Sequence, residues 1–370
     1  MPVTGSRSTR ASALAAIVCA TLFAGVPVAS ASAQTRITIG GAGPLYYPNI
    51  LTNLPLGRFY LWGTDEAGGP PISILEGYDL LNHMIGENWF PDSSPQVVNY
   101  PASIGLISGS LAAPGANQAV AMGRISLDDQ IRNASAGGEH VVIAALSEGT
   151  LVINSELAHL ATSPDAPRSD QLSFAMFASP ELGLADIYLP TGLTVPIVGY
   201  TVRGLADSQY DVSIVFHQYD AWADPPDRPW NLLADLNALM GTLYFHNNSA
   251  LASPSETVTV SEVTNALGGT VTTSMIPSPT LPLLEPLRQL GFPTQTVDWL
   301  NSTLKPVVDA GYSRLTPDAG PYFSHGRLVC GSSATTIPAA SRATLRKPSR
   351  RGAQASQPAA PAVAGGASSR

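Results

Sequence analysis

The sequence predicts an α/β fold in which a mainly parallel central sheet carries helices on both faces. Three observations support this prediction. Short apolar runs alternate along the chain with segments of helical periodicity, a glycine-rich turn follows the first run, and a serine between small residues follows a later one. Strands that alternate with helices are typical of a parallel sheet, in which reactive groups gather at the carboxyl ends of the strands.

The expected elements follow from hydrophobic periodicity. Strands are expected at residues 36–39, 59–62, 96–100, 140–146, 172–177, 195–202 and 212–219, and helices at 72–89, 116–136, 150–160 and 230–245. Two later segments, 257–260 and 269–275, are expected to form strands that cap the site described below. An ordinary surface hairpin is the alternative for this pair.

The pentapeptide Ala145-Leu146-Ser147-Glu148-Gly149 lies between an expected strand and an expected helix. A strand, a tight turn that carries serine, and a helix form the nucleophile elbow of an α/β-hydrolase. The turn requires small residues two positions before and two positions after the serine, and alanine and glycine stand there. The serine is therefore a candidate nucleophile, with a plain strand-to-helix turn as the alternative.

A serine nucleophile needs a histidine to accept its proton and a carboxylate to orient that histidine. In this fold the chain order is serine, acid, histidine. The strand expected at 212–219 ends at Asp220, at the sheet edge where an acid is needed. Asp224, four residues into the following loop, is the rival acid. Either aspartate is also typical of a turn or a helix cap.

His246 follows the helical pattern of residues 230–245 and is the candidate base. A histidine just after a buried helix can reach a site at the end of the sheet. Alternatively, it is a cation at a helix C-terminus, where the helix dipole favours positive charge. Its position does not separate these readings, and His325, late in the chain, is the rival base.

The oxyanion of an acyl-transfer intermediate requires backbone N–H donors. Glu148, directly after the serine, is expected to supply one, and Gly41 or Ala42 in the glycine-rich turn another. The same turn lacks the spacing of dinucleotide-binding and phosphate-binding loops. Metal-ligand spacings are also missing from the sequence, so neither a cofactor nor a metal is predicted.

Charge is distributed unevenly along the 370 residues, whose formal net charge is −8. All 27 acidic residues lie between Asp65 and Asp318, and only 11 Lys and Arg lie between Gln34 and Ala334. Nucleic acids attract basic surfaces, so this acidic region argues against nucleic acid as a partner.

Both ends of the sequence differ in composition from the rest. Residues 1–33 combine Arg7 and Arg10 with a small apolar stretch and two Ala-Ser-Ala cleavage patterns, which predicts a removable secretory signal and a secreted or envelope-associated protein. Residues 335–370 are rich in Ala, Ser, Pro and Arg, which predicts a disordered basic tail. Such a tail is able to associate with anionic envelope lipid. One domain is expected at 34–334.

Several of these blocks resemble the PE-PPE domain family of mycobacterial serine hydrolases, which are related to cutinases. The family pattern has a Gly-Gly loop, a serine elbow, a Tyr-Asp block with a following helix that ends in histidine, and a late Pro-Leu-Leu block. The matching segments here are Ile39 to Gly43, Ala145 to Gly149, Tyr219 to Pro226, Pro229 to Ala238, Tyr244 to His246, Leu281 to Arg288 and Val308 to Tyr312. The resemblance extends over most of residues 36–315.

The resemblance implies an α/β-hydrolase that acts on acyl esters through Ser147, Asp220 and His246. Family members with signal peptides are similar to cutinase-like proteins that acylate trehalose glycolipids in the cell envelope. Hydrolysis and acyl transfer to a glycolipid are therefore both implied, and both use one acyl-enzyme.

Three features depart from the family pattern. A predicted signal stands in place of the helical PE or PPE leader, Ala145 replaces glycine, and Glu148 replaces glutamine. An inward-pointing charge on Glu148 would repel a developing oxyanion. These departures motivate the alternative that the chain is a non-catalytic lipid-binding protein that keeps the hydrolase fold.

Overall fold

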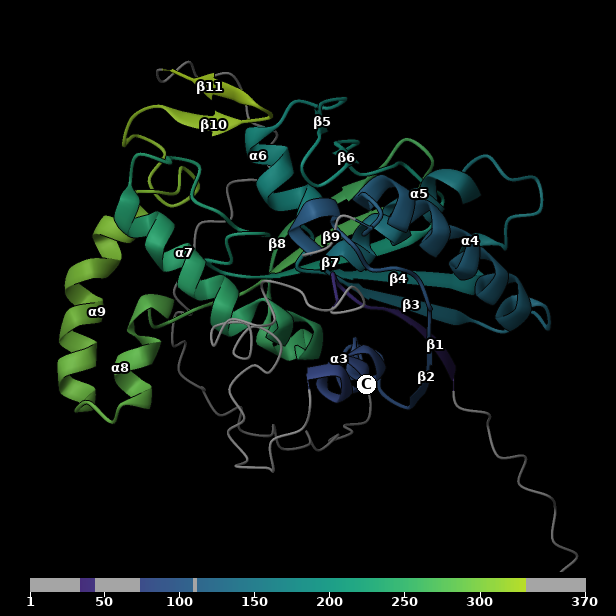
Figure 1. The fold of residues 1–370 in the computed structure, drawn as a ribbon, viewed down its shortest axis with the longest axis horizontal. Coiled ribbons are helices and arrows are strands. Elements are labelled where there is room, and N and C mark those ends of the chain that lie inside the picture. Colours follow the sequence, from purple (N-terminus) through teal and green to yellow (C-terminus); the bar gives the residue numbers. More distant parts are fainter. Residues whose placement is uncertain (1–33, 44–73, 109–111, 331–370) are drawn as a thin grey trace, which may run out of the picture. The chain divides into compact units, whose positions relative to one another are not determined.

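The computed structural model describes residues 34–43, 74–108 and 112–330 (Figure 1). The predicted signal at 1–33, the predicted strand at 59–62 and the predicted tail at 335–370 lie outside these residues. The described part forms a central seven-stranded sheet with helices on both of its faces. The predicted α/β fold class is therefore confirmed.

The sheet has the strand order β2-β1-β3-β4-β7-β9-β8. Its strands are β1 (Gln34–Ile39), β2 (Ser93–Val97), β3 (Val141–Leu146), β4 (Leu172–Phe177), β7 (Asp211–His217), β8 (Val258–Thr264) and β9 (Thr270–Ile276). All neighbours are parallel except β8 and β9, which are antiparallel. The carboxyl ends of β1, β3, β4 and β7 therefore meet at one edge of the sheet.

The strands expected at residues 257–260 and 269–275 are confirmed as β8 and β9, which pair as an antiparallel hairpin. The hairpin extends the central sheet at its edge, with β8 largely exposed, so the alternative of a surface hairpin describes it better than a pair of strands that cap the site. β9 pairs in parallel with β7, from Val212 opposite Val271 to His217 opposite Ile276. The pairing covers β7, whose backbone groups would otherwise form an open edge.

The strand expected at 195–202 is also wrong. Only β5 (Thr194–Val195) and β6 (Tyr200–Thr201) form there, as a small antiparallel hairpin outside the central sheet. Pro196 lacks the N–H that a central strand would donate, and Gly199 adopts a positive φ of 63°. The run therefore turns back on itself between the two short strands.

Seven α-helices lie in the described residues. They are α3 (Ile74–Met84), α4 (Ala116–Ser135), α5 (Glu148–Leu160), α6 (Asp186–Tyr188), α7 (Leu232–Phe245), α8 (Glu285–Gln289) and α9 (Thr294–Asp309). A 3₁₀ segment, η4 (Asn247–Leu251), follows α7, and a hairpin of β10 (Tyr322–Ser324) and β11 (Arg327–Val329) ends the described chain. None of the helices in this part of the chain combines the length and apolarity that a membrane span requires.

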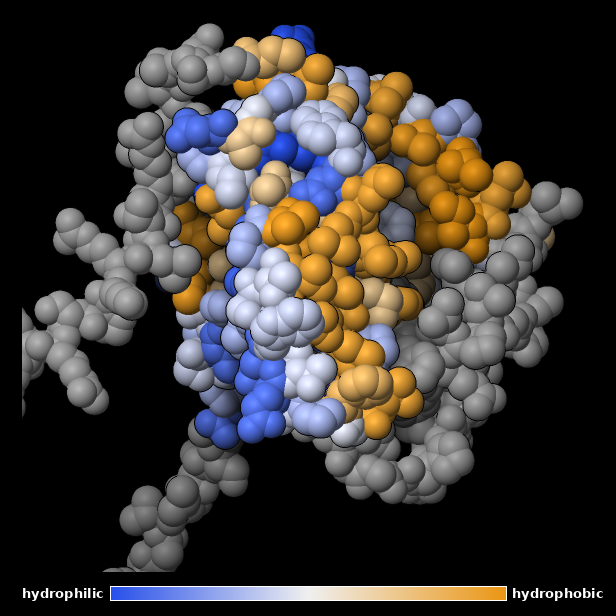
Figure 2. Space-filling model, turned by 90° about the vertical axis from the view of Figure 1, so that its left-hand side faces the viewer, coloured by the Kyte–Doolittle hydropathy of each residue, from blue (hydrophilic) through white to orange (hydrophobic). Residues whose placement is uncertain are grey.

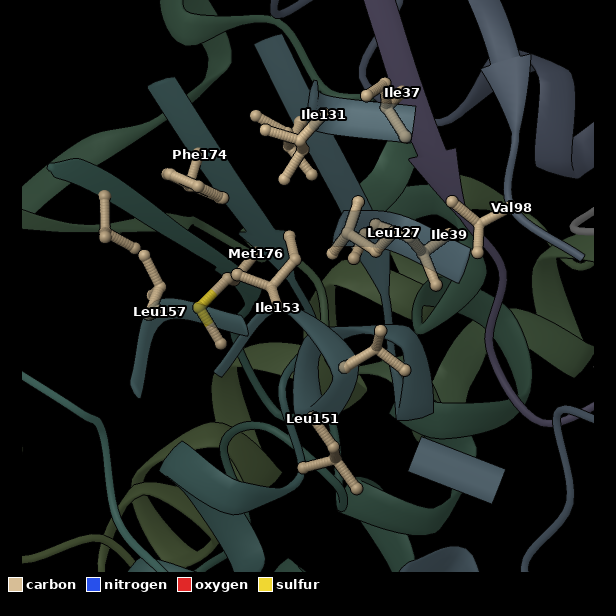
Figure 3. Packing of buried hydrophobic residues seen from close by; sticks show 14 of the residues in the cluster. Ile37, Ile39, Val98, Leu127, Ile131, Leu151, Ile153, Leu157, Phe174 and Met176 are labelled. Carbon is tan, nitrogen blue, oxygen red and sulfur yellow. The ribbon is translucent and has the colours of Figure 1, made fainter. Parts of the chain in front are cut away.

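Alternate residues of β3 face opposite sides of the sheet, and this alternation builds two apolar layers. Ile143 and Ala145 pack on one side with residues of α4 and α5, as Figure 3 shows for the surrounding cluster. Ala144 and Leu146 pack on the other side with Ile85 and with Ala250 of η4. Because both faces of β3 are covered, the strand reads as a continuous apolar run in the sequence.

One acidic side chain lies between α4 and α5, remote from the edge where the carboxyl ends meet. Glu156 is completely buried, its carboxyl lies 3.7 Å from Nη1 of Arg124, and neither of its oxygens has a hydrogen bond of normal geometry. Burial is the main cause that raises the pKa of Glu156 to about 8, the nearby Asp128 adds to the rise, and Arg124 opposes it.

A Glu156→Gln variant is expected to lose part of the pH dependence of stability. The folded state keeps the Glu156 proton up to about pH 8, whereas the unfolded chain releases it near pH 4.5. The free energy of unfolding therefore falls as the pH rises between these values. Thermal melts at pH 5.5 and pH 8.5 measure the effect, and equal losses in wild type and variant would contradict it.

Candidate active site

Ser147 occupies a strained turn between β3 and α5. Its backbone has φ 53° and ψ −121°, a conformation that costs a residue with a side chain about 1–3 kcal/mol. The turn is held because the N–H of Ser147 donates to the carbonyl of Phe177 at 2.9 Å, and Thr150 Oγ1 donates to the carbonyl of Ser147 at 2.6 Å. This geometry is that of a nucleophile elbow.

The small residues around Ser147 have a steric cause. A Cβ atom on Gly149 would lie 2.5 Å from the carbonyl oxygen of Ile39 and 2.7 Å from that of Gly40. Only glycine therefore lets the first turn of α5 approach the end of β1 this closely. Ala145 is completely buried within the apolar layer on the α4 and α5 side.

Asp220 and His246 form a buried pair at the same edge of the sheet. Nδ1 of His246 lies 2.6 Å from Oδ2 of Asp220, and both side chains are completely buried. The other carboxylate oxygen accepts from Thr242 Oγ1 at 2.9 Å and from the N–H of Trp222 at 3.1 Å. A carboxylate that accepts from Nδ1 keeps the imidazole proton on that nitrogen. Nε2 is then the basic nitrogen of the ring.

Thr242 is a member of this arrangement that the sequence analysis did not identify. It lies four residues before His246, and positions i and i+4 share one face of a helix. Thr242 of α7 and His246, directly after α7, therefore reach the same carboxylate. Thr242 also accepts the N–H of Ala221 at 3.0 Å, which ties the loop after β7 to the helix. The i, i+4 spacing was the available signal.

A single strand, β4, separates the end of β3 from the end of β7. Neighbouring strands lie about 4.8 Å apart, so these ends are about 10 Å apart. A carboxylate and an imidazole in line are long enough to extend across such a gap. Ala250 of η4, the segment after α7, packs in the cluster that contains Leu146 of β3. The ring of His217 at the end of β7 stacks on Phe245 at 4.3 Å between centroids, which holds the end of α7 against β7.

The rival acid, Asp224, makes different contacts. It accepts the N–H of Tyr219 at 2.8 Å and forms an ion pair with Arg314 at 2.5 Å. Burial raises its pKa, and the charge of Arg314 and its hydrogen bond oppose the rise. Asp224 thus braces the loop in which Tyr219, with φ 69°, immediately precedes Asp220.

An Asp224→Asn variant is expected to lose stability rather than catalytic activity. Breaking a largely buried ion pair is expected to lower the free energy of unfolding by about 2–3 kcal/mol. Activity per folded molecule should fall less than about tenfold, because the contacts of Asp220 remain. Chemical denaturation and kcat/KM measured on one sample check this, and a loss of activity as large as that of an Asp220 variant would contradict it.

The rival base, His325, lies on the exposed turn of the β10–β11 hairpin. Its Nδ1 is 2.9 Å from Oδ1 of Asp186, and the imidazole is 76% exposed. This histidine pairs with α6 instead of with an acid at the strand ends. The geometry therefore favours His246 over His325 as the partner of Asp220.

The glycine-rich turn after β1 lies beside the serine. A Cβ atom on Gly41 would be 2.9 Å from Cβ of Ser147 and 3.6 Å from its Oγ. Two tyrosines hold this turn: Tyr100 donates its hydroxyl to the carbonyl of Gly40 at 2.7 Å, and Tyr78 donates to the carbonyl of Gly41 at 2.7 Å. Their hydroxyl roles were not anticipated, because neither the helical pattern around Tyr78 nor the strand expected at 96–100 indicates where a ring hydroxyl points.

Comparison with known proteins shows the family of this chain. Residues 91–313 match the PE-PPE domain, which is more than half of the chain. The chain belongs to the PE-PPE domain family. The resemblance drawn from the sequence blocks is thereby confirmed, and the match includes the Ser147 turn, Asp220 and His246.

Relatives in Mycobacterium tuberculosis are similar over much of this PE-PPE family chain. It is 52% identical to the uncharacterized PPE family protein PPE63 over 298 residues, which is 80% of this chain and 59% of that protein. It is 34% identical to SL1278 acyltransferase Chp1 over 81% of this chain and 69% of that protein. It is 35% identical to diacyltrehalose acyltransferase Chp2 over 67% of this chain and 73% of that protein. The chain thus matches about three fifths of PPE63.

Proposed function

We propose that this chain is a serine acyl-ester hydrolase and acyltransferase that acts on cell-envelope lipids. Ser147 attacks the acyl carbonyl, His246 accepts its proton through Nε2, and Asp220 holds the imidazole and stabilises its charged form. The backbone N–H groups of Glu148 and of Gly41 or Ala42 receive the oxyanion. Water or a sugar hydroxyl then attacks the acyl-enzyme.

The observation that carries this proposal is the buried Asp220–His246 pair at the sheet edge where Ser147 holds its strained conformation. A histidine that only caps a helix does not need to pair with a completely buried carboxylate that accepts hydrogen bonds from two further donors, Thr242 and Trp222. Burying that charge costs free energy unless the group is fully hydrogen-bonded. The arrangement is thus better explained by catalysis than by helix capping.

The names of two relatives support the substrate class. Chp1 is named as an SL1278 acyltransferase and Chp2 as a diacyltrehalose acyltransferase. A third relative, esterase PE16, is 34% identical over 54% of this chain. We therefore propose acyl esters of glycolipids as substrates, with transfer to trehalose-type hydroxyls as the favoured outcome.

The exposed surface of α7 to α9 supports a lipid substrate. Figure 2 views this side of the molecule and shows apolar side chains gathered across it. The exposed large apolar residues on α7, on α9 and in the turn between α8 and α9 are Leu232, Leu236, Leu239, Leu290, Phe292, Trp299 and Val307. Such side chains stabilise contact with acyl chains, at about 1.5–3 kcal/mol for each one that becomes fully buried.

A Trp299→Ser and Leu232→Ser double variant is expected to act about tenfold more slowly on dispersed long-chain esters. Its rate on a short soluble ester should stay within about twofold of wild type, because neither side chain lies at the strand ends. Ile125→Ser, at an exposed apolar position of α4, is the matched control. Equal losses on both substrates would contradict a role in lipid contact.

The test of the function supplies an acyl donor and two acceptors. Purified protein is incubated with a medium-chain p-nitrophenyl ester in water, with and without trehalose, and the products are resolved by mass spectrometry. We expect nitrophenol release and acyl-trehalose formation that both disappear in the Ser147→Ala variant. Products that are identical in wild type and variant would overturn the catalytic function and favour the non-catalytic lipid-binding alternative.

We propose export as well, because residues 1–33 have the pattern of a cleavable secretory signal. The basic residues of 335–370 are proposed to add contact with anionic envelope lipid. Fractionation of cells that express the full chain or a chain without residues 335–370 tests this. Unchanged envelope association after the deletion would overturn the role of the tail.

A further inference from the structure

Two tyrosine hydroxyls determine the direction of the proposed oxyanion donors. A trans peptide group is planar, so its N–H points opposite to its C=O. Tyr100 holds the carbonyl of Gly40, which directs the N–H of Gly41 away from Tyr100. Tyr78 likewise holds the carbonyl of Gly41, which directs the N–H of Ala42. The two candidate donors of the turn are therefore aimed by Tyr78 and Tyr100.

The carboxyl of Glu148 lies among these groups. Glu148 is only 2% exposed and begins α5 directly after Ser147. It shares a helix face with Val152, four residues later. A Cβ atom on Gly123 of α4 would lie 2.9 Å from Val152 and 3.0 Å from the ring of Tyr100, so that ring packs against the Glu148 face of α5.

No basic side chain among the described residues compensates for the burial of Glu148. Neither carboxyl oxygen has a hydrogen bond of normal geometry, and the backbone N–H of Ser103 is the donor that opposes the effect of burial. Burial raises the pKa of Glu148 to about 8. The N-terminus of α5 favours an anion by about 0.3–1 kcal/mol, which is too little to reverse this shift.

Among the residues that the structure describes, the other titratable groups that face Glu148 are the two tyrosines. Tyr78 comes from α3 and Tyr100 from the segment after β2, and a charge on Glu148 contributes to raising the pKa of both hydroxyls. Burial is the larger cause for each. Both phenols therefore stay neutral through the pH range in which Glu148 titrates.

We propose that Glu148, Tyr78 and Tyr100 form one positioning unit, which aims the N–H groups of Gly41 and Ala42 only while Glu148 is neutral. Ionised Glu148 is an acceptor and competes with the two glycine carbonyls for the tyrosine O–H groups. It also places negative charge next to the developing oxyanion. The role rests on the proposed serine chemistry, and it makes Glu148 an acid that inactivates the site when it loses its proton.

The test compares Glu148→Gln with Glu156→Gln, a matched control at the other buried glutamate of α5. Wild type is expected to lose about tenfold in kcat for a short p-nitrophenyl ester between pH 7 and pH 9, since about nine tenths of a group of pKa 8 is ionised at pH 9. Glu156→Gln should lose the same amount. Glu148→Gln should stay within about twofold across this range.

Tyr78→Phe and Tyr100→Phe test the positioning step. Each is expected to lower kcat about 5- to 50-fold with KM within about twofold, because the donors act on the transition state and not on bound substrate. Thermal melts of every variant verify that it is folded. Unchanged kcat in both phenylalanine variants would overturn the role of the tyrosines.

A direct titration does not depend on activity. ¹³C NMR of protein labelled at glutamate carboxyls should show one resonance that is absent in Glu148→Gln and titrates near pH 8. Titration of that resonance near pH 4–5, or an alkaline loss of kcat that Glu148→Gln retains, would overturn this inference. If Ser147→Ala is as active as wild type, the proposed function fails instead, and the oxyanion role of Glu148 fails with it.

Discussion

Replacement of Ser147 by alanine is expected to lower kcat/KM for a p-nitrophenyl ester by about 10⁴-fold or more. Alanine removes the only atom that forms the acyl-enzyme, and the remaining oxyanion donors cannot replace a covalent step. Stability should change little or increase slightly, because alanine keeps the small volume that the turn requires. Initial rates over a range of substrate concentrations, together with thermal melts, measure both effects.

Ser179→Ala is the matched control for this variant. Ser179 is also buried, follows the end of β4 at the same sheet edge, and lies 2.9 Å from Thr150 through its hydroxyl. Its removal is expected to leave kcat/KM within about threefold of wild type. A Ser147→Ala protein that keeps even a tenth of wild-type activity would show that the reaction does not depend on this elbow.

Replacement of Asp220 by asparagine is expected to lower kcat by about 10³- to 10⁴-fold. Asparagine keeps the shape and the bonds from Thr242 and Trp222 but removes the charge that stabilises the imidazolium. When its amide NH₂ faces Nδ1, it also favours the imidazole tautomer whose Nε2 carries the proton and cannot accept another. Steady-state kinetics from pH 6 to pH 9 measure the loss.

Asp224→Asn is the comparison that distinguishes the roles of the two acids. It removes the same charge from the same loop, where Asp224 accepts the N–H of Tyr219, and leaves the contact between Asp220 and His246 in place. Equal kinetic losses in the two asparagine variants would contradict the assignment of Asp220 as the acid. A loss confined to Asp220→Asn would support it.

Much of the site was predictable because each member stands at the end of a periodic segment. Ser147 follows the fully buried β3, Asp220 follows β7 after a short turn, and His246 directly follows α7. In a parallel sheet, ends of this kind meet at one edge. Asp220 and Asp224 were not separable, because both follow the same strand and only the fold shows which carboxylate meets the imidazole.

Other features depend on contacts that the sequence does not carry. The hairpin of β8 and β9 has the same alternating pattern whether it caps a site or joins a sheet. It joins the sheet because β7 offers an unpaired edge to which β9 binds. Tyr78 counts as an apolar position of a helix, although its hydroxyl holds Gly41. The pairing of Asp224 with Arg314 joins segments 90 residues apart, a separation at which spacing has no predictive value.

Covalent labelling by a fluorophosphonate tests the central claim most directly, because it reports an activated serine without knowledge of the substrate. Intact-mass and peptide analysis of the labelled protein should find one adduct, on Ser147. The labelling rate should fall at least 100-fold in His246→Ala and stay near that of wild type in His325→Ala. An adduct on another serine, or equal rates in wild type and His246→Ala, would contradict the assignment of Ser147 and His246 as nucleophile and base.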